Sequence, residues 1–220
     1  MNKTKIEWCT MTWNPVTGCK HGCKYCYAAK ISERFGWSFE PEIHRERLEE
    51  PQLKKQPQNI FVCSMSDLFG DWVPYEWLEK VFDVCNGAPQ HRYLFLTKNP
   101  SRYVELAKNG LLPSGDNYWY GSTTPTQGGQ YWYPASHKTF RSIEPILNKF
   151  DRFTVPIRYA DWVIIGAETG NRKGKVIPKY EWIENIVENC RWTGTPVFMK
   201  KSLASIWGEP LIQEYPWEKG

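Results

Sequence analysis

The stretch NIFVCSMSDLFGDWVPYEWLEKVFDVCNGAPQHRYLFLT, residues 59–97, decides the fold class. Residues 59–65 and residues 92–97 are apolar runs of the length typical of buried strands. Between them, Pro74 is well placed to open a helix. The apolar residues of that helix fall on one face: Trp77, Leu78, Val81, Phe82 and Cys85. An order of strand, helix and strand predicts parallel strands joined by a helical crossover.

The alternation of strands and helices extends outward from this stretch in both directions. One helix is expected after Asn99-Pro-Ser, ending at Asn109-Gly110, and another over residues 180–190 with a single apolar stripe. Further strands are expected at residues 10–13, 118–121, 138–143, 161–166 and 196–200. We therefore predict an α/β fold, a partial TIM-like barrel of about six to seven parallel strands with helical crossovers.

Length, composition and charge limit the class of protein. The chain has 220 residues, so we expect a single domain over residues 1–220. Its 41% hydrophobic and 24% charged residues exclude disordered and fibrous classes. A net charge of +4 spread along the chain tolerates nucleic acid without indicating it. No apolar run has the length of a signal peptide or the ~20 residues of a membrane span, so we expect a cytoplasmic protein without membrane association.

Three of the seven cysteines, Cys19, Cys23 and Cys26, crowd into eight positions directly after the first expected strand. In a parallel sheet this places them at the carboxyl edge, where α/β folds carry their active sites. Three thiolates on one tight loop can each bind one iron of a cubane and leave the fourth iron without a protein ligand. Gly18 and Gly22 let the backbone wrap closely around such a group. The loop therefore predicts an iron–sulfur cluster.

A structural zinc site is the alternative for the same cysteines. His21 or Cys9 would then complete a tetrahedral centre that only braces the fold. Structural zinc usually uses two separated ligand pairs, and the chain has no second pair. Among the other cysteines, Cys85 and Cys190 fall on helical core stripes and Cys63 in a strand.

The spacing of the three cysteines, with the aromatic Tyr25 just before the last, resembles the signature of the radical SAM superfamily. That resemblance implies a 4Fe-4S cluster whose open iron binds S-adenosyl-L-methionine (SAM). It also implies reductive cleavage of SAM to methionine and a 5′-deoxyadenosyl radical, which abstracts a hydrogen atom from a substrate. An external electron donor would supply the electron.

Further segments resemble a narrower group, the phage-associated three-cysteine radical-SAM-like family, whose function is unsettled. They are residues 5–8, 12–19, 61–69, 89–91, 96–98, 142–145 and 161–170, with the letters KIEW, TWNPVTGC, FVCSMSDLF, PQH, LTK, SIEP and DWVIIGAETG. The matches span nearly the whole chain. The cysteine loop is shorter than the usual family pattern and closer to the superfamily spacing, which favours a competent cluster.

The resemblance implies that side chains following the second strand hold the amino group of SAM. These side chains are Ser64, Ser66 and Asp67. A helix N-terminal cap is the alternative for Asp67. Ser122, after the fourth strand, is expected to meet the ribose or the carboxylate, or to be a plain turn serine.

The resemblance implies further cofactor contacts at later strand ends. Arg141 suits the methionine carboxylate through a bidentate pair, and Glu144 flanks the same strand end. A structural ion pair is the alternative for these two residues. Gly166 resembles the small-residue motif beneath the adenine, and Glu168 contacts either the cofactor or the substrate. Lys98 and Lys200 would neutralise a phosphate or a developing charge, or would be solvated.

The sequence does not specify the substrate, which we expect to be a small molecule or a nucleic acid. Because the barrel is short, we also expect a protein partner that covers its open end. The aromatic residues at 118–120 and 131–133 would stack a base or pack in the core. Two other functions compete with a radical SAM enzyme. One is a phage nucleic-acid-binding protein with a structural three-cysteine metal site, and the other is a non-catalytic radical SAM scaffold that acts with a partner.

Overall fold

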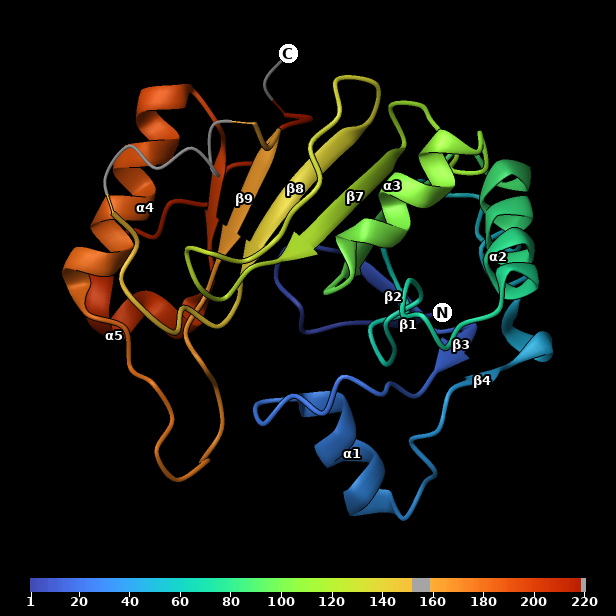
Figure 1. Cartoon of the computed structure of the whole chain (residues 1–220), viewed down its shortest axis with the longest axis horizontal. Helices are drawn as coiled ribbons and strands as arrows, with labels where there is room; N and C mark the ends of the chain where they lie inside the picture. Colours follow the sequence, from blue (N-terminus) through green and yellow to red (C-terminus); the bar gives the residue numbers. More distant parts are fainter. Residues whose placement is uncertain (152–158, 219–220) are drawn as a thin grey trace. The chain divides into compact units, whose positions relative to one another are not determined.

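The computed structural model describes residues 1–151 and 159–218 (Figure 1). Eight strands form one sheet in the order β1-β2-β5-β6-β7-β8-β9-β10. The strands are β1 (Asn2–Lys3), β2 (Met11–Trp13), β5 (Asn59–Val62), β6 (Arg92–Thr97), β7 (Tyr118–Thr123), β8 (Lys138–Ile143), β9 (Trp162–Ile165) and β10 (Val197–Met199). A separate antiparallel pair joins β3 (Val16–Thr17) to β4 (Glu42–Ile43).

Helices lie in the connections from β2 to β5, β5 to β6, β6 to β7 and β9 to β10, whereas residues 124–137 connect β7 to β8 without one. The helices are α1 (Tyr27–Phe35), α2 (Tyr75–Gly87), α3 (Pro100–Lys108), α4 (Tyr180–Thr193) and α5 (Ala204–Trp207), with short 3-10 turns at Arg45–Arg47 and Lys201–Leu203. Parallel pairing joins β2 to β5, β5 to β6, β8 to β9 and β9 to β10, whereas β1 runs antiparallel to β2. The predicted α/β class, with a mostly parallel sheet and helical crossovers, is confirmed. The sheet order is open at β1 and β10, as an incomplete barrel requires.

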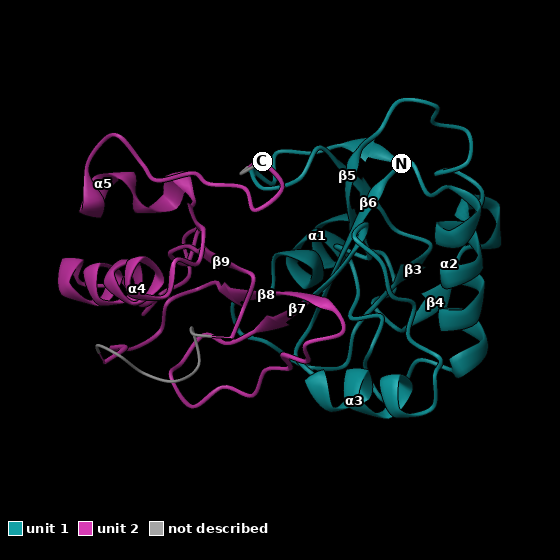
Figure 2. Cartoon of the chain, turned by 90° about the horizontal axis from the view of Figure 1, so that it is seen from above, with its two compact units in different colours: residues 1–120 teal, residues 121–220 magenta. Residues whose placement is uncertain are grey.

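The chain divides into two compact units, which Figure 2 draws in different colours. Unit 1 comprises Met1–Tyr120 and unit 2 comprises Gly121–Gly220. Each unit has its own core, as described below. The expectation of a single domain stays a prediction.

Unit 1 buries one face of α2 and α3 beside β5 and β6. The predicted stripe on α2 is confirmed for Leu78, Val81, Phe82 and Cys85, all of which are buried. Phe69 lies at the centre of an aromatic cluster that also contains Phe82, Phe95 and Tyr103. Tyr118, Trp119 and Tyr120 are buried as well, so these three rings pack in the core.

Unit 2 is built on the stripe of α4. Its Ile183, Ile186, Val187 and Cys190 pack against Ile143 of β8, Val163 and Ile165 of β9, and Val197 and Met199 of β10. Residues near the end of the chain cover the outer edge of β10: Ile212 O accepts from Met199 N at 2.7 Å, and Glu214 N donates to Val197 O at 3.0 Å. The edge strand is therefore paired. No helix of the described residues is long and apolar enough to span a membrane.

Candidate metal centre

The cysteine loop, residues 18–26, follows β2 and β3 in the chain and leads directly into α1. The parallel strands β2 and β5 pair with Trp13 opposite Val62, so the loop and the segment after β5 leave the sheet at the same edge. Cys26 is the N-cap residue of α1, and its Sγ accepts a hydrogen bond from Ala29 N at 3.4 Å. Cys19 N donates to Phe39 O at 3.1 Å, which fixes the first cysteine.

Glycine is required at position 18 for two reasons. Gly18 has a φ of +85°, and a Cβ built there would lie 2.1 Å from Glu40 O. Gly22 has a φ of +63°, but a Cβ there would meet nothing within 4 Å. The expectation that glycines let the backbone wrap tightly is therefore confirmed at Gly18, whereas Gly22 supplies only a left-handed turn.

The three loop thiols are free, half-buried and electrostatically coupled. Burial raises the pKa of Cys19 to about 11; a backbone hydrogen bond from His21 lowers it, and the charges of Asp67, Cys26 and Cys23 raise it by smaller amounts. Burial also raises the pKa of Cys23, while the nearby Lys98 lowers it. Metal binding to Cys19 and Cys23 therefore requires the release of their thiol protons.

The remaining cysteines belong to the core. Cys9, Cys63, Cys85 and Cys190 are all buried. Burial raises the pKa of Cys63 to about 12 and holds the pKa of Cys85 and Cys190 above the usual thiol range. Cys63 also has a φ of 59°, which turns the chain sharply after β5 and starts the polar segment described below.

An iron–sulfur cubane and a single metal ion require different arrangements of the loop donors. In the described part of the chain, no three or more His, Cys, Asp or Glu side chains are grouped so that they could hold a metal ion as they stand. In a cubane each cysteine binds a different iron, so the sulfurs need not meet at one atom. Of the two proposed fourth zinc ligands, Cys9 precedes β2 while the loop follows it. His21 Nε2 lies 2.7 Å from Asp67 Oδ2, which leaves Nδ1 as the ring nitrogen that could bind a metal. The zinc alternative therefore stays a prediction.

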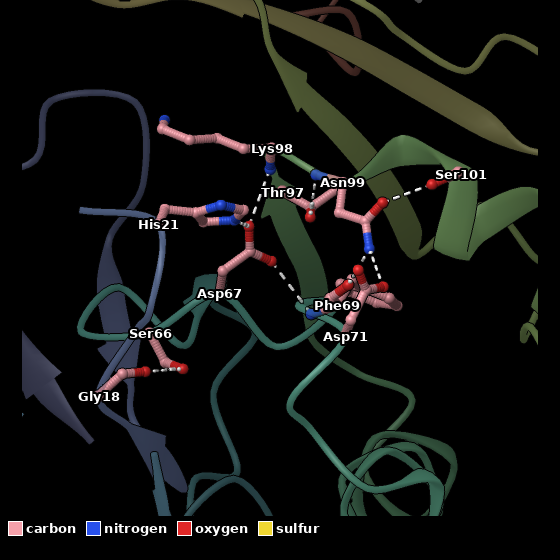
Figure 3. A network of polar contacts seen from close by, with 10 residues as sticks. All are labelled: Gly18, His21, Ser66, Asp67, Phe69, Asp71, Thr97, Lys98, Asn99 and Ser101. Carbon is pink, nitrogen blue, oxygen red and sulfur yellow. Dashed lines mark hydrogen bonds and ion pairs between the residues drawn. The ribbon is translucent and has the colours of Figure 1, made fainter. Parts of the chain in front are cut away.

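The segment after β5 forms hydrogen bonds with the start of the cysteine loop (Figure 3). Ser66 Oγ donates to Gly18 O at 2.7 Å, and Gly18 N donates to Met65 O at 3.0 Å. Asn14 Oδ1 accepts from Ser64 Oγ at 3.1 Å and from Met65 N at 3.0 Å. The structure therefore brings Ser64 and Ser66 beside the cysteine loop, as expected.

Asp67 lies beside the same loop, but it is not a helix cap. Its Oδ1 accepts from Phe69 N at 3.1 Å in a local turn, and α2 begins eight positions later at Tyr75, behind its N-cap residue Pro74. The helix-cap alternative for Asp67 is therefore wrong. Tyr25, within the loop, has Lys98 Nζ 5.6 Å from its ring centroid, so the side chain of Lys98 reaches the loop from the end of β6.

The unit 2 residues predicted for the cofactor fall into separate contacts. Ser122 Oγ accepts from Trp132 N at 3.3 Å. Glu144 and Lys200 form an ion pair of 2.7 Å, and both pack on Gly166, where an added Cβ would lie 3.1 Å from Lys200 Cδ. Both carboxylate oxygens of Glu168 accept from Arg172, at 2.6 and 2.8 Å, in a bidentate pair.

Arg141 lies on the other face of β8 from Glu144. Alternation along the strand puts Arg141 with Ile143, on the side that packs against α4. Its guanidinium carbon lies 5.0 Å from the ring centroid of Tyr131 and 5.6 Å from that of Phe150, and its Nε donates to Thr124 Oγ1 at 2.5 Å. Burial lowers the pKa of Arg141 to about 10. The predicted ion pair with Glu144 is wrong, because Glu144 pairs with Lys200.

A family model described as "Protein of unknown function (DUF5131)" matches residues 3–212. The chain belongs to this family. No curated protein and no solved structure matches the chain. Membership of DUF5131 brings no assigned activity, so the function of this member rests on its own residues.

This DUF5131 protein also has a polar cavity at the opposite edge of the unit 1 strands, which the sequence did not indicate. The cavity is about 340 Å³ and is lined by Thr10, Pro57, Gln58, Asn59, Pro89, Gln90, His91, Arg92, Asp116 and Asn117. His91 Nδ1 accepts from Gln58 N at 3.2 Å, and its Nε2 lies 2.9 Å from Pro51 O. His91 is thus a satisfied structural histidine that holds two loops together.

Proposed function

We propose that this member of DUF5131 is a radical SAM enzyme that binds a 4Fe-4S cluster through Cys19, Cys23 and Cys26. One observation carries the proposal: the three loop thiols are half-buried and free, and they lie within eight positions of one loop. The other four cysteines are buried in the core. A distinction of this kind between accessible and buried thiols is typical of ligand cysteines beside structural ones.

Residues of unit 1 would bind and orient SAM next to the loop. Three cysteines leave one iron of a cubane without a protein ligand, and in the superfamily SAM occupies that iron. When bound, the cluster supplies an electron, taken from an external donor, for the reductive cleavage of SAM. Ser64, Ser66 and Asp67 are the proposed contacts of the SAM amino group. The Asp67 carboxylate already accepts three hydrogen bonds and keeps one acceptor position on Oδ1.

Residues of unit 2 are the proposed contacts of the rest of the cofactor. Gly166 remains the proposed adenine contact, which requires the side chains of Lys200 and Glu144 to move off it. Lys200 lies against Gly166, whereas Arg141 faces α4. Arg141 stays the proposed partner of the SAM carboxylate, which requires its side chain to leave the α4 side. Ser122 and Glu168 stay proposed contacts of the ribose and of the cofactor or substrate.

A nucleotide or nucleic acid is the substrate class that the aromatic residues of unit 2 favour. The rings of Tyr131 and Tyr133 stack at 4.7 Å, and Tyr133 stacks on Tyr159 at 4.8 Å. Tyr133 is 44% exposed and Tyr159 is 45% exposed. Such exposed, stacked rings can accept a base, which contributes about 1–3 kcal/mol per base. A protein partner and an external electron donor complete the proposal.

Metal content after anaerobic reconstitution tests the proposal. We expect a brown protein with about four irons and four sulfides per chain, and an electron paramagnetic resonance signal after reduction. The matched control is a variant with all three loop cysteines changed to Ala, which should hold no iron. A colourless wild-type protein with one zinc per chain would overturn the proposal.

A further inference from the structure

A histidine within the cysteine loop forms a hydrogen bond with a carboxylate outside the loop. His21 stands between Cys19 and Cys23, and its Nε2 lies 2.7 Å from Asp67 Oδ2 (Figure 3). The Asp67 side chain is only 7% exposed and the His21 side chain 22%. The edge of the His21 ring also meets Trp72, with the ring centroids 4.8 Å apart. The middle of the loop is therefore held by a side-chain contact as well as by its backbone.

Asp67 is itself fixed by two backbone donors from different parts of unit 1. Phe69 N donates to Oδ1 at 3.1 Å, and Lys98 N, just after β6, donates to Oδ2 at 2.8 Å. The carboxylate thus joins the segment after β5 to the end of β6. The side chain of Lys98 then reaches back over the Tyr25 ring. Asp67 connects the loop to both strands.

We infer that Asp67 is a positioning residue, which holds the cysteine loop through His21 in the arrangement that receives metal. The inference rests on the proposed function and extends it to residues outside the ligand set. A loop with two left-handed glycines is costly to order, and a fixed contact made before binding removes part of that cost. His21 Nε2 is the donor of this contact, because the carboxylate oxygens of Asp67 only accept.

The same contact gives His21 a structural role in the loop that does not require it to be a ligand. Its Nε2 is used by Asp67, and its ring packs on Trp72. Outer residues of this kind typically change metal affinity by about 10–100-fold when they are removed. We expect a loss of that size when the His21–Asp67 contact is broken while the three cysteines stay in place.

Two variants of His21 separate positioning from packing. His21→Phe keeps a ring against Trp72 but removes the donor, and His21→Gln keeps an N–H donor within reach of Asp67. Asp71→Asn is the matched control, because Asp71 accepts from Asn99 at 2.7 Å in the same network without contacting the loop. Thermal unfolding of all three variants verifies that each is folded.

The first readout is iron retention by the reconstituted protein against a graded series of a ferrous chelator. The chelator concentration that removes half of the iron should fall about 10–100-fold in His21→Phe. His21→Gln and Asp71→Asn should stay close to wild type. Equal retention by His21→Phe and wild type would overturn the inference, whatever the enzyme's activity. If wild type holds zinc in place of iron, the proposed function fails, and competition with a zinc chelator gives the same test of positioning.

The second readout needs no metal. Phenylarsine oxide bridges two neighbouring thiols, so its affinity for the metal-free protein reports how the loop cysteines are arranged. His21→Phe should bind it about tenfold more weakly than wild type, and His21→Gln should restore binding. The inference is wrong if all variants bind it equally.

Discussion

Replacing Gly18 with Ala should destabilise the protein far more than replacing Gly22 with Ala. Both residues have a positive φ, and that conformation costs an Ala residue about 1–2 kcal/mol. At Gly18 the new Cβ would also lie 2.1 Å from Glu40 O and 2.7 Å from Phe39 O. Both oxygens are backbone atoms, so the chain itself must move, which adds about 1–3 kcal/mol. We expect a loss of about 2–5 kcal/mol for Gly18→Ala.

Urea unfolding of the metal-free protein measures this difference, with Gly22→Ala as the matched control. Gly22→Ala should lose only the conformational cost of about 1–2 kcal/mol, because nothing lies within 4 Å of its added Cβ. Gly18→Ala should also retain less iron, because Cys19 follows it directly and donates to Phe39 O. Equal unfolding free energies for the two variants, within about 0.5 kcal/mol, would refute the close approach of the loop to residues 39–40.

Three further predictions concern the thiols and a buried charge. Because iodoacetamide reacts with thiolates and the pKa values of Cys19 and Cys23 are raised, labelling of the folded, metal-free protein should be slow and should accelerate at alkaline pH, with Cys19, Cys23 and Cys26 labelled before the four buried cysteines, as mass spectrometry would show. Cys85→Ala and Cys190→Ala should each lower the unfolding free energy by about 1–2 kcal/mol and leave the iron content unchanged; a loss of iron would contradict the core assignment. Arg141→Met should raise the unfolding free energy by about 1 kcal/mol, because Nη1 and Nη2 are buried with no hydrogen-bond partner among the described residues, and their cost exceeds the lost cation–π contacts and the bond to Thr124; a fall measured in urea would contradict this.

The sequence predicted those parts of the fold that have a clear period. The stripes of α2 and α4 recur every three or four residues, and their members are buried as expected except Trp77, which is half-buried. The longer strands were recognisable as apolar runs. The two-residue strands β1, β3 and β4 were missed, because such short segments carry no period.

For a strand that is buried on both faces, the sequence did not show which side chains point to which face. Phe140, Arg141, Ser142 and Ile143 are all buried, so no alternation of polar and apolar residues marks the side of β8 that faces α4. The resemblance placed Arg141 at the cofactor, whereas the register of β8 with β9 puts it beside Ile143 on the α4 side.

Contacts between residues that are far apart in the chain could not be predicted from the sequence either. His21 and Asp67 are 46 positions apart, and Lys200 and Glu144 are 56 positions apart. A single histidine in a loop belongs to no sequence pattern from which its hydrogen-bond partner could be predicted. The three closely spaced cysteines did carry such a pattern, and for that reason the loop could be singled out as a metal site before its surroundings were known.

The most direct test of the radical SAM proposal is the formation of 5′-deoxyadenosine. The anaerobically reconstituted protein is incubated with SAM and dithionite, and the nucleoside is measured by chromatography. Wild type should release 5′-deoxyadenosine together with methionine, and the variant with Cys19, Cys23 and Cys26 changed to Ala should release none. Wild-type protein that carries a full cluster and yet forms no more 5′-deoxyadenosine than this variant would contradict the proposal.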